Sequence, residues 1–336
     1  MDHFVVFPVN EDGIFLNPKL VGGALEDAMQ PPFNFSDLFI YSHGWWTNGN
    51  NAMAEYGQYT IEFTKTFLSM QGVISPPTDS FGIGIHWPST LSEDGDSVRE
   101  AFQFASYYQM GRRANQVGAN GLFATLRRAL RVRQEISKKP IRLTLIGHSF
   151  GCRVVCKALQ FLCKDLDNTN TPPAYKTFVD NIQFNVILLQ AAFKNDEFEA
   201  GGNYDRLIAL PKLKMLVTTS QFDLALNDVF PAAETANNIA HLQLHEAVAL
   251  GAGGPTQATI HAYNAYQGGI PLKLQSGFAY AGVPVLGNER QLVADLMGLH
   301  AARIASGDYI KDKFSGSHSD ISSPEIYNLI AGFAFQ

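Results

Sequence analysis

Two glycines enclose a serine at a point where the sequence changes its pattern. Residues 141–159 read IRLTLIGHSFGCRVVCKAL. The first six residues are largely apolar, as in a buried strand, whereas the residues after Gly151 carry apolar side chains at helical spacing. A strand that turns directly into a helix forces the turning residue, here Ser149, into strained backbone geometry. Glycines at 147 and 151 remove the side chains that would collide, so the sequence predicts a sharp turn that exposes the Ser149 hydroxyl.

Short apolar runs alternate with helical patterns along most of the chain. We expect strands at residues 38–42, 81–86, 141–146, 182–190 and 213–219. We expect helices at residues 52–70, 98–137 (interrupted near Gly111 and Gly118), 152–164, 289–306 and 324–333. Such alternation is typical of an α/β protein with a mainly parallel sheet covered on both faces. Near the N-terminus, residues 4–8 and 13–16 predict a short β-hairpin.

One stretch, residues 227–309, departs from this alternation. It contains two glycine-rich segments, residues 251–255 and 268–269, together with several aromatic residues. We interpret it as an insertion above the carboxyl edge of the sheet, where it would serve as a lid or as the wall of a pocket. Residues 1–336 then form a single domain, because α/β enzymes of this length often fold as one domain with insertions.

The composition argues against several classes of function. A formal net charge of −6 disfavours a nucleic-acid-binding surface, which needs clustered Lys and Arg. No stretch reaches the roughly 18 apolar residues of a membrane span, and the first residues lack the pattern of a signal peptide. Three cysteines lie on one predicted helix and are expected to be buried free thiols, which favours a cytoplasmic protein; they are Cys152, Cys156 and Cys163.

Two further histidines, His241 and His245, would share one face of a helix. The residues between them lack the glutamate of a metalloprotease His-Glu-x-x-His motif. We therefore expect two ordinary helix-face histidines there and no metal site.

A serine at such a turn needs partners, because its hydroxyl is a weak nucleophile until a base removes the proton. Where the serine stands on a strand-to-helix turn of this kind, an acid and then a histidine follow it along the chain. Asp223 comes just after the strand expected at residues 213–219 and is the candidate acid. Asp196 and Asp228 are its rivals, since Asp196 follows the preceding strand and Asp228 lies close by.

His318 is the candidate base. It lies in a polar loop with Gly316, directly before the last predicted helix, where an imidazole reaches the edge of the sheet. His300 falls inside a helical pattern and is expected to be structural, whereas His261 belongs to the insertion. Chain order disfavours the histidines that precede or adjoin the serine, namely His3, His43, His86 and His148.

Attack on a carbonyl group also needs two backbone N–H groups that face the negative oxygen developing on it. Phe150, directly after the serine, would donate one of them. Trp45, in the loop HGWW that follows the strand at residues 38–42, would donate the other. Trp46 and His43 are candidate substrate-binding residues of the same loop: Trp46 would wall the acyl pocket, and His43 would brace the loop rather than transfer protons.

These residues together resemble the α/β-hydrolases of the serine esterase and lipase type. The matching pieces are the His43-Gly44-Trp45 loop, the segment from Gly147 to Gly151, Asp223 and His318. More narrowly, the chain is similar to a bacterial group of predicted hydrolases with a Trp-Pro-Ser segment, here at residues 87–89, and a catalytic loop like residues 318–321. The resemblance covers about residues 36–230 and 310–335, and not the insertion.

The resemblance implies an α/β-hydrolase fold with an eight-stranded, mostly parallel sheet flanked by helices on both faces. It further implies hydrolysis of a small-molecule carboxylic ester through a Ser149–His318–Asp223 triad and an acyl-enzyme, with no cofactor. Two other functions stay open, because a fold does not fix a function. One is transfer of the acyl group to an acceptor other than water, and the other is a non-catalytic binding protein on the same scaffold.

Overall fold

The computed structural model describes residues 3–45, 47, 49–69, 77, 79–90, 103–234, 247–260, 272–274, 291–307 and 316–335. Its centre is an eight-stranded sheet in which every described strand pair is parallel. The strand order is β1-β3-β2-β4-β5-β6-β8-β7. The strands are β1 (His3–Pro8), β2 (Asp37–Ser42), β3 (Ser80–His86), β4 (Arg142–His148), β5 (Gln183–Leu189), β6 (Leu213–Thr219), β7 (Leu272–Leu274) and β8 (Gln291–Asp295).

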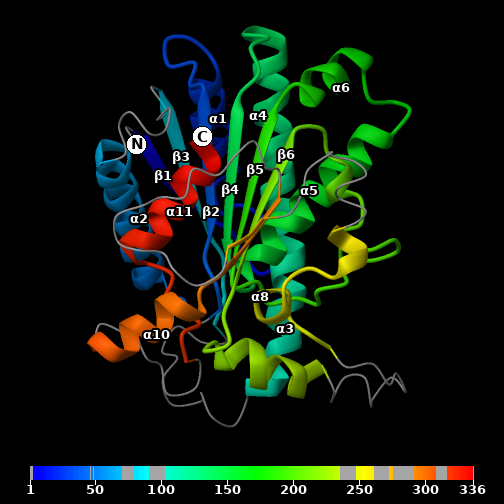
Figure 1. Ribbon diagram of the computed structural model, residues 1–336. Coiled ribbons are helices and arrows are strands. Elements are labelled where there is room, and N and C mark those ends of the chain that lie inside the picture. The colour runs from blue at the N-terminus through cyan, green and yellow to red at the C-terminus, as the bar shows by residue number, and fades with distance from the viewer. Residues whose placement is uncertain are drawn as a thin grey trace.

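Helices cover both faces of this sheet (Figure 1). One face carries α1 (Pro18–Met29), α3 (Gln103–Gln116), the π-helix η1 (Val117–Leu122), α4 (Phe123–Ile136), α5 (Gly151–Asp167) and α6 (Pro173–Asp180). The other face carries α2 (Gly49–Ser69), α10 (Met297–Ser306) and α11 (Pro324–Phe335). Shorter helices lie in the loops; they are η2 (Leu207–Ala209), η3 (Ala225–Val229) and α8 (Leu250–Gly253).

Strand β2 shows why these strands read as unbroken apolar runs in the sequence. Its side chains alternate between the two hydrophobic clusters, with Leu38 and Ile40 in one and Phe39 and Tyr41 in the other. Both clusters exclude water, so every position of the strand is buried. The parallel sheet, its two covered faces and the strand-to-helix turn after β4 are those of the α/β-hydrolase fold, as expected from the sequence.

Three segments differ from the sequence predictions. Strand β1 pairs in parallel with β3 rather than forming a hairpin. Where the hairpin was expected, the structure has an isolated antiparallel bridge between Val9 and Phe15. Residues 291–295 are strand β8, although the sequence favoured one helix across 289–306. The long helical pattern is interrupted at η1, near Gly118, whereas Gly111 lies inside α3.

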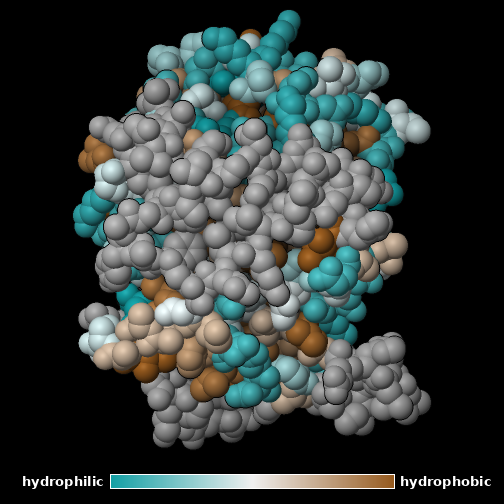
Figure 2. All heavy atoms as spheres, viewed as in Figure 1, coloured by the Kyte–Doolittle hydropathy of each residue, from teal (hydrophilic) through white to brown (hydrophobic). Residues whose placement is uncertain are grey.

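Part of the stretch expected as an insertion belongs to the sheet itself. Strand β8 pairs with β6 along its whole length and with β7 on its other side. The helix that follows, α10, buries Leu299 and His300, and its outer side contributes to the apolar area at the lower left of Figure 2. None of the helices that the structure describes combines the length and the apolar character needed to span a bilayer.

Candidate active site

The turn after β4 places Ser149 in a strained conformation. Ser149 has a backbone φ of +54°, in the left-handed region that residues with a side chain rarely occupy. Its N–H donates to the Leu189 carbonyl at 3.0 Å, and its own carbonyl accepts from Cys152 N–H at 3.1 Å, where helix α5 begins. Such backbone conformations cost about 1–3 kcal/mol and persist only where the surrounding structure enforces them. The turn therefore matches the strand-to-helix elbow that the sequence predicted.

Close packing explains the glycines on either side. A Cβ atom at Gly151 would lie 2.1 Å from the Ser42 carbonyl oxygen, at the end of β2. A Cβ atom at Gly147 would lie 2.6 Å from the backbone nitrogen of Cys152. Both distances are far below van der Waals contact, so any side chain at these two positions would push the elbow away from the sheet.

Asp223 lies in the loop after β6, as the sequence predicted. Its side chain is fully buried, and Oδ1 accepts the Leu226 N–H at 3.0 Å. The two rival acids, Asp196 and Asp228, are exposed. Of the three aspartates, Asp223 is therefore the one that is buried.

Gly316 brings the loop with His318 against the Asp223 loop. It has a φ of +60°, and a Cβ atom there would lie 2.3 Å from the Phe222 carbonyl oxygen. Residues 223 and 316 form an antiparallel bridge, and Ser317 N–H donates to the Phe222 carbonyl at 2.9 Å. This short pairing joins two segments that are far apart in the sequence.

Asp223, His318 and Ser149 form a continuous chain of hydrogen bonds. His318 Nδ1 lies 2.7 Å from Asp223 Oδ2, and His318 Nε2 lies 2.7 Å from Ser149 Oγ. The carboxylate only accepts hydrogen bonds, so it favours the tautomer with the proton on Nδ1. Nε2 then accepts from the Ser149 hydroxyl, the arrangement that a general base needs. The His318 side chain is only 12% exposed, so these two hydrogen bonds are largely shielded from water.

The loop after β2 lies directly against the elbow. A Cβ atom at Gly44 would lie 3.0 Å from the Cβ of Ser149. The next residue, Trp45, packs edge-on against Phe150, with 5.6 Å between the ring centroids. Within the part of the chain that the structure describes, no hydrogen bond uses the Phe150 N–H. Trp46, the other candidate from this loop, lies outside the described residues.

His43 is fully buried beneath this loop. Its Nδ1 lies 2.8 Å from the Gly44 carbonyl oxygen and therefore carries the proton, whereas Nε2 accepts from Trp87 N–H at 3.3 Å. The ring also stacks on Trp87 with an interplanar angle of 4°. A ring with both nitrogens occupied and no exposed surface supports the loop from behind and does not face the site.

Behind His318 lies a buried polar network that the sequence did not predict. His300, which was expected to be structural, has Nδ1 2.7 Å from Ser220 Oγ and Nε2 3.3 Å from the Asp320 carbonyl oxygen. Arg303 Nε lies 2.8 Å from the Asp320 carboxylate. Gln190 Nε2, from the end of β5, donates to the Ser317 carbonyl at 3.2 Å. These contacts fix the loop on both sides of His318, and no local sequence pattern indicates them because the partners come from distant segments.

Buried histidines predict a loss of stability in mild acid. Burial lowers the pKa of His43 and of His148 from the ordinary 6.5 to about 3, with the neighbouring His318 contributing at His148. The unfolded chain therefore binds these two protons at a higher pH than the folded chain does. The free energy of unfolding is then highest above pH 6.5 and falls below it, by about 1.4 kcal/mol per pH unit for each histidine.

Urea unfolding at a series of pH values between 7.5 and 5 measures this slope. His43→Gln, which removes one of the two groups, is expected to flatten the slope by about one proton. A slope that is the same in His43→Gln and in the wild type would contradict the assignment of a neutral, buried ring to His43.

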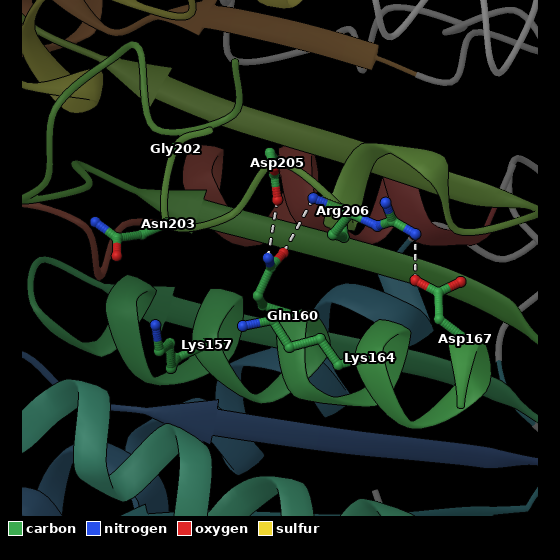
Figure 3. Close-up of a pocket in the computed structure, with 8 residues that line it drawn as sticks. All are labelled: Lys157, Gln160, Lys164, Asp167, Gly202, Asn203, Asp205 and Arg206. Carbon is green, nitrogen blue, oxygen red and sulfur yellow. Dashed lines mark hydrogen bonds and ion pairs between the residues drawn. The ribbon is translucent and has the colours of Figure 1, made fainter. Parts of the chain in front are cut away.

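A polar hollow on the α5 face, shown in Figure 3, lies apart from this site. It has a volume of about 440 Å³, and Gln160 at its floor lies about 14 Å along the helix from Gly151. Gln160 Nε2 donates to Asp205 at 2.9 Å and its Oε1 accepts from Arg206 N–H at 3.1 Å, while the Arg206 guanidinium pairs with Asp167. These contacts tie the loop after β5 to helix α5.

No protein-family model and no curated protein matches the sequence. Among solved structures, the chain is similar to the crystal structure of LpqC, a poly(3-hydroxybutyrate) depolymerase from Bordetella parapertussis. The similarity has a TM-score of 0.34 and 14% sequence identity, and it covers 83% of this chain and 81% of that chain. At this low level of similarity the match adds nothing to the description of the site.

Proposed function

We propose that this protein is a serine hydrolase that cleaves small-molecule carboxylic esters. The observation that carries the proposal is the chain from Ser149 Oγ to His318 to Asp223, with both hydrogen bonds at 2.7 Å and the serine on a strained elbow. This arrangement lets an imidazole remove the hydroxyl proton while a buried carboxylate holds the ring.

The first half of the reaction forms an acyl-enzyme. Ser149 Oγ attacks the ester carbonyl carbon as His318 Nε2 takes the hydroxyl proton, and the carbonyl oxygen becomes negatively charged. The N–H groups of Phe150 and Trp45 stabilise that oxygen; the proximity of Gly44 to Ser149 and the unused N–H of Phe150 support this role. The tetrahedral intermediate then collapses, His318 gives its proton to the leaving alkoxide oxygen, and the alcohol departs.

The second half repeats these steps with water. His318 takes a proton from water as the oxygen attacks the acyl carbon, and it returns that proton to Ser149 Oγ as the carboxylic acid leaves. Asp223 keeps the ring in its working tautomer and stabilises the positive charge that the ring carries between the two transfers. In this account His43 acts on the substrate only indirectly, by bracing the loop that bears Trp45, and Trp46 remains a predicted wall of the acyl pocket.

A panel of p-nitrophenyl esters of increasing acyl length tests the proposal. We expect release of p-nitrophenol well above the uncatalysed rate, with a clear optimum of acyl length. A folded protein that hydrolyses no member of the panel and is not modified by a fluorophosphonate would rule out the proposed function.

Asp223→Asn should lower kcat by about 10⁴-fold while the fold is retained, because an amide in place of the carboxylate no longer selects the working tautomer of His318. Asp196→Asn and Asp228→Asn are matched controls at exposed positions, and each is expected to stay within about twofold of the wild-type kcat. Steady-state kinetics of the three variants, with circular dichroism to check folding, makes the comparison. The assignment is wrong if either control shows the large loss and Asp223→Asn does not.

A further inference from the structure

His148 occupies the position between Gly147 and Ser149 in the elbow, yet its ring serves another loop. Its Nε2 lies 2.8 Å from the carbonyl oxygen of His318, a residue 170 positions further along the chain. A carbonyl oxygen only accepts, so Nε2 carries the proton and donates it to this bond. The two imidazole rings lie 5.0 Å apart between centroids, and His148 is only 5% exposed.

The other ring nitrogen of His148 faces the loop after β2. A Cβ atom at Gly44 would lie 3.0 Å from His148 Nδ1 and 3.0 Å from the Ser149 Cβ. Burial keeps the His148 ring neutral, with a pKa of about 3, so the ring holds a single proton and that proton is on Nε2. The ring therefore stands where the elbow, the loop with Trp45 and the loop with His318 meet.

We propose that His148 is a positioning residue, which holds the His318 carbonyl so that the turn carrying the nucleophile also sets the place of the general base. This inference rests on the function proposed above. The strained elbow then has two roles, because the turn that directs the Ser149 hydroxyl toward His318 Nε2 also directs the His148 N–H toward the backbone of the base. The elbow with His148 and Ser149 then sets the distance of 2.7 Å between Ser149 Oγ and His318 Nε2.

The expected effect follows from the sensitivity of catalysis to alignment. A displacement of about 1 Å between a nucleophile and its partner costs on the order of 100-fold in rate. Loss of the Nε2 donor releases the His318 carbonyl, and the imidazole moves with its backbone. The loss should appear in kcat, because the bond from His148 does not touch the substrate.

Two amide substitutions distinguish the need for a hydrogen-bond donor at the position of His148 Nε2 from the need for any polar side chain there. The Gln side chain places its Nε2 amide near the position of the imidazole Nε2, whereas the shorter Asn places its amide near Nδ1. We expect His148→Asn to lose about 100-fold in kcat with KM within about threefold of wild type, and His148→Gln to recover to within about tenfold of wild type. His3→Leu, at the far edge of the sheet, controls for loss of an imidazole elsewhere and should behave as wild type.

The measurements are kcat and KM on the best ester of the panel, the rate of fluorophosphonate labelling, and thermal unfolding of each variant. A positioning role predicts slower labelling of His148→Asn in proportion to its kcat. Equal activity of the Asn and Gln variants, at any level, would overturn the role of the Nε2 donor. If that equality occurs while Ser149→Ala is inactive, only this inference fails; an inactive, unlabelled wild type would overturn the proposed function and this inference together.

Discussion

Ser149→Ala is expected to lower kcat for ester hydrolysis by on the order of 10⁶-fold, which is what removal of the nucleophile costs in a serine triad. The serine is buried and contacts His318 through its hydroxyl alone, so its removal leaves the packing nearly unchanged. We therefore expect the melting temperature to stay close to that of the wild type. It can rise slightly, because alanine has no hydroxyl to desolvate.

Initial rates on the best p-nitrophenyl ester, measured at high enzyme concentration, resolve a loss of this size. Ser137→Ala, at the end of α4 and remote from the elbow, is a matched control and should retain wild-type kcat. The nucleophile is misassigned if Ser149→Ala, folded and free of wild-type contamination, keeps more than about a tenth of the wild-type activity.

His318→Ala has the second large expected effect. Ser149 then has no base within reach, and kcat should again fall by on the order of 10⁶-fold. The His318 side chain is 12% exposed, and its ring hydrogen-bonds only to Ser149 and Asp223 among the described residues. Thermal unfolding should therefore change little.

His300→Ala is the informative comparison for this variant. His300 is fully buried and joins Ser220 to the Asp320 carbonyl, so its loss leaves a cavity and unpaired polar groups and costs about 2–4 kcal/mol of unfolding free energy. We expect that variant to be clearly less stable and only modestly slower. The reverse result, an inactive His300→Ala and an active His318→Ala, would mean that the histidine of the site has been misplaced.

The central strands were predictable because of where they lie. β2, β4, β5 and β6 are buried on both faces, so each reads as a largely apolar run that ends at a polar or glycine-containing loop. β8 was not predictable in this way, since Gln291–Asp295 runs directly into α10 and the two share one apolar pattern. Strand β1 was read as half of a hairpin because Asn10–Gly13 favours a turn, whereas its real partner, β3, is far along the chain.

The residues of the site were partly predictable and its geometry was not. Gly147 and Gly151 identified the elbow, and chain order narrowed the acid and the base to a few candidates. The choice of Asp223 over Asp228 depends on burial, which no local pattern reports. His148 shows the limit most clearly: chain order removed it from the candidates for the base, but its contact with the His318 carbonyl follows only from the folded arrangement of two distant loops.

Mass-spectrometric mapping of a fluorophosphonate adduct tests the central claim most directly, because the reagent marks whichever serine the protein itself activates. We expect a single adduct, on the peptide that contains Ser149, formed rapidly in the wild type and not detectably in His318→Ala over the same time. An adduct on any other serine would contradict the proposal that the elbow, Asp223 and His318 form one catalytic unit, as would the absence of an adduct in a preparation that hydrolyses esters.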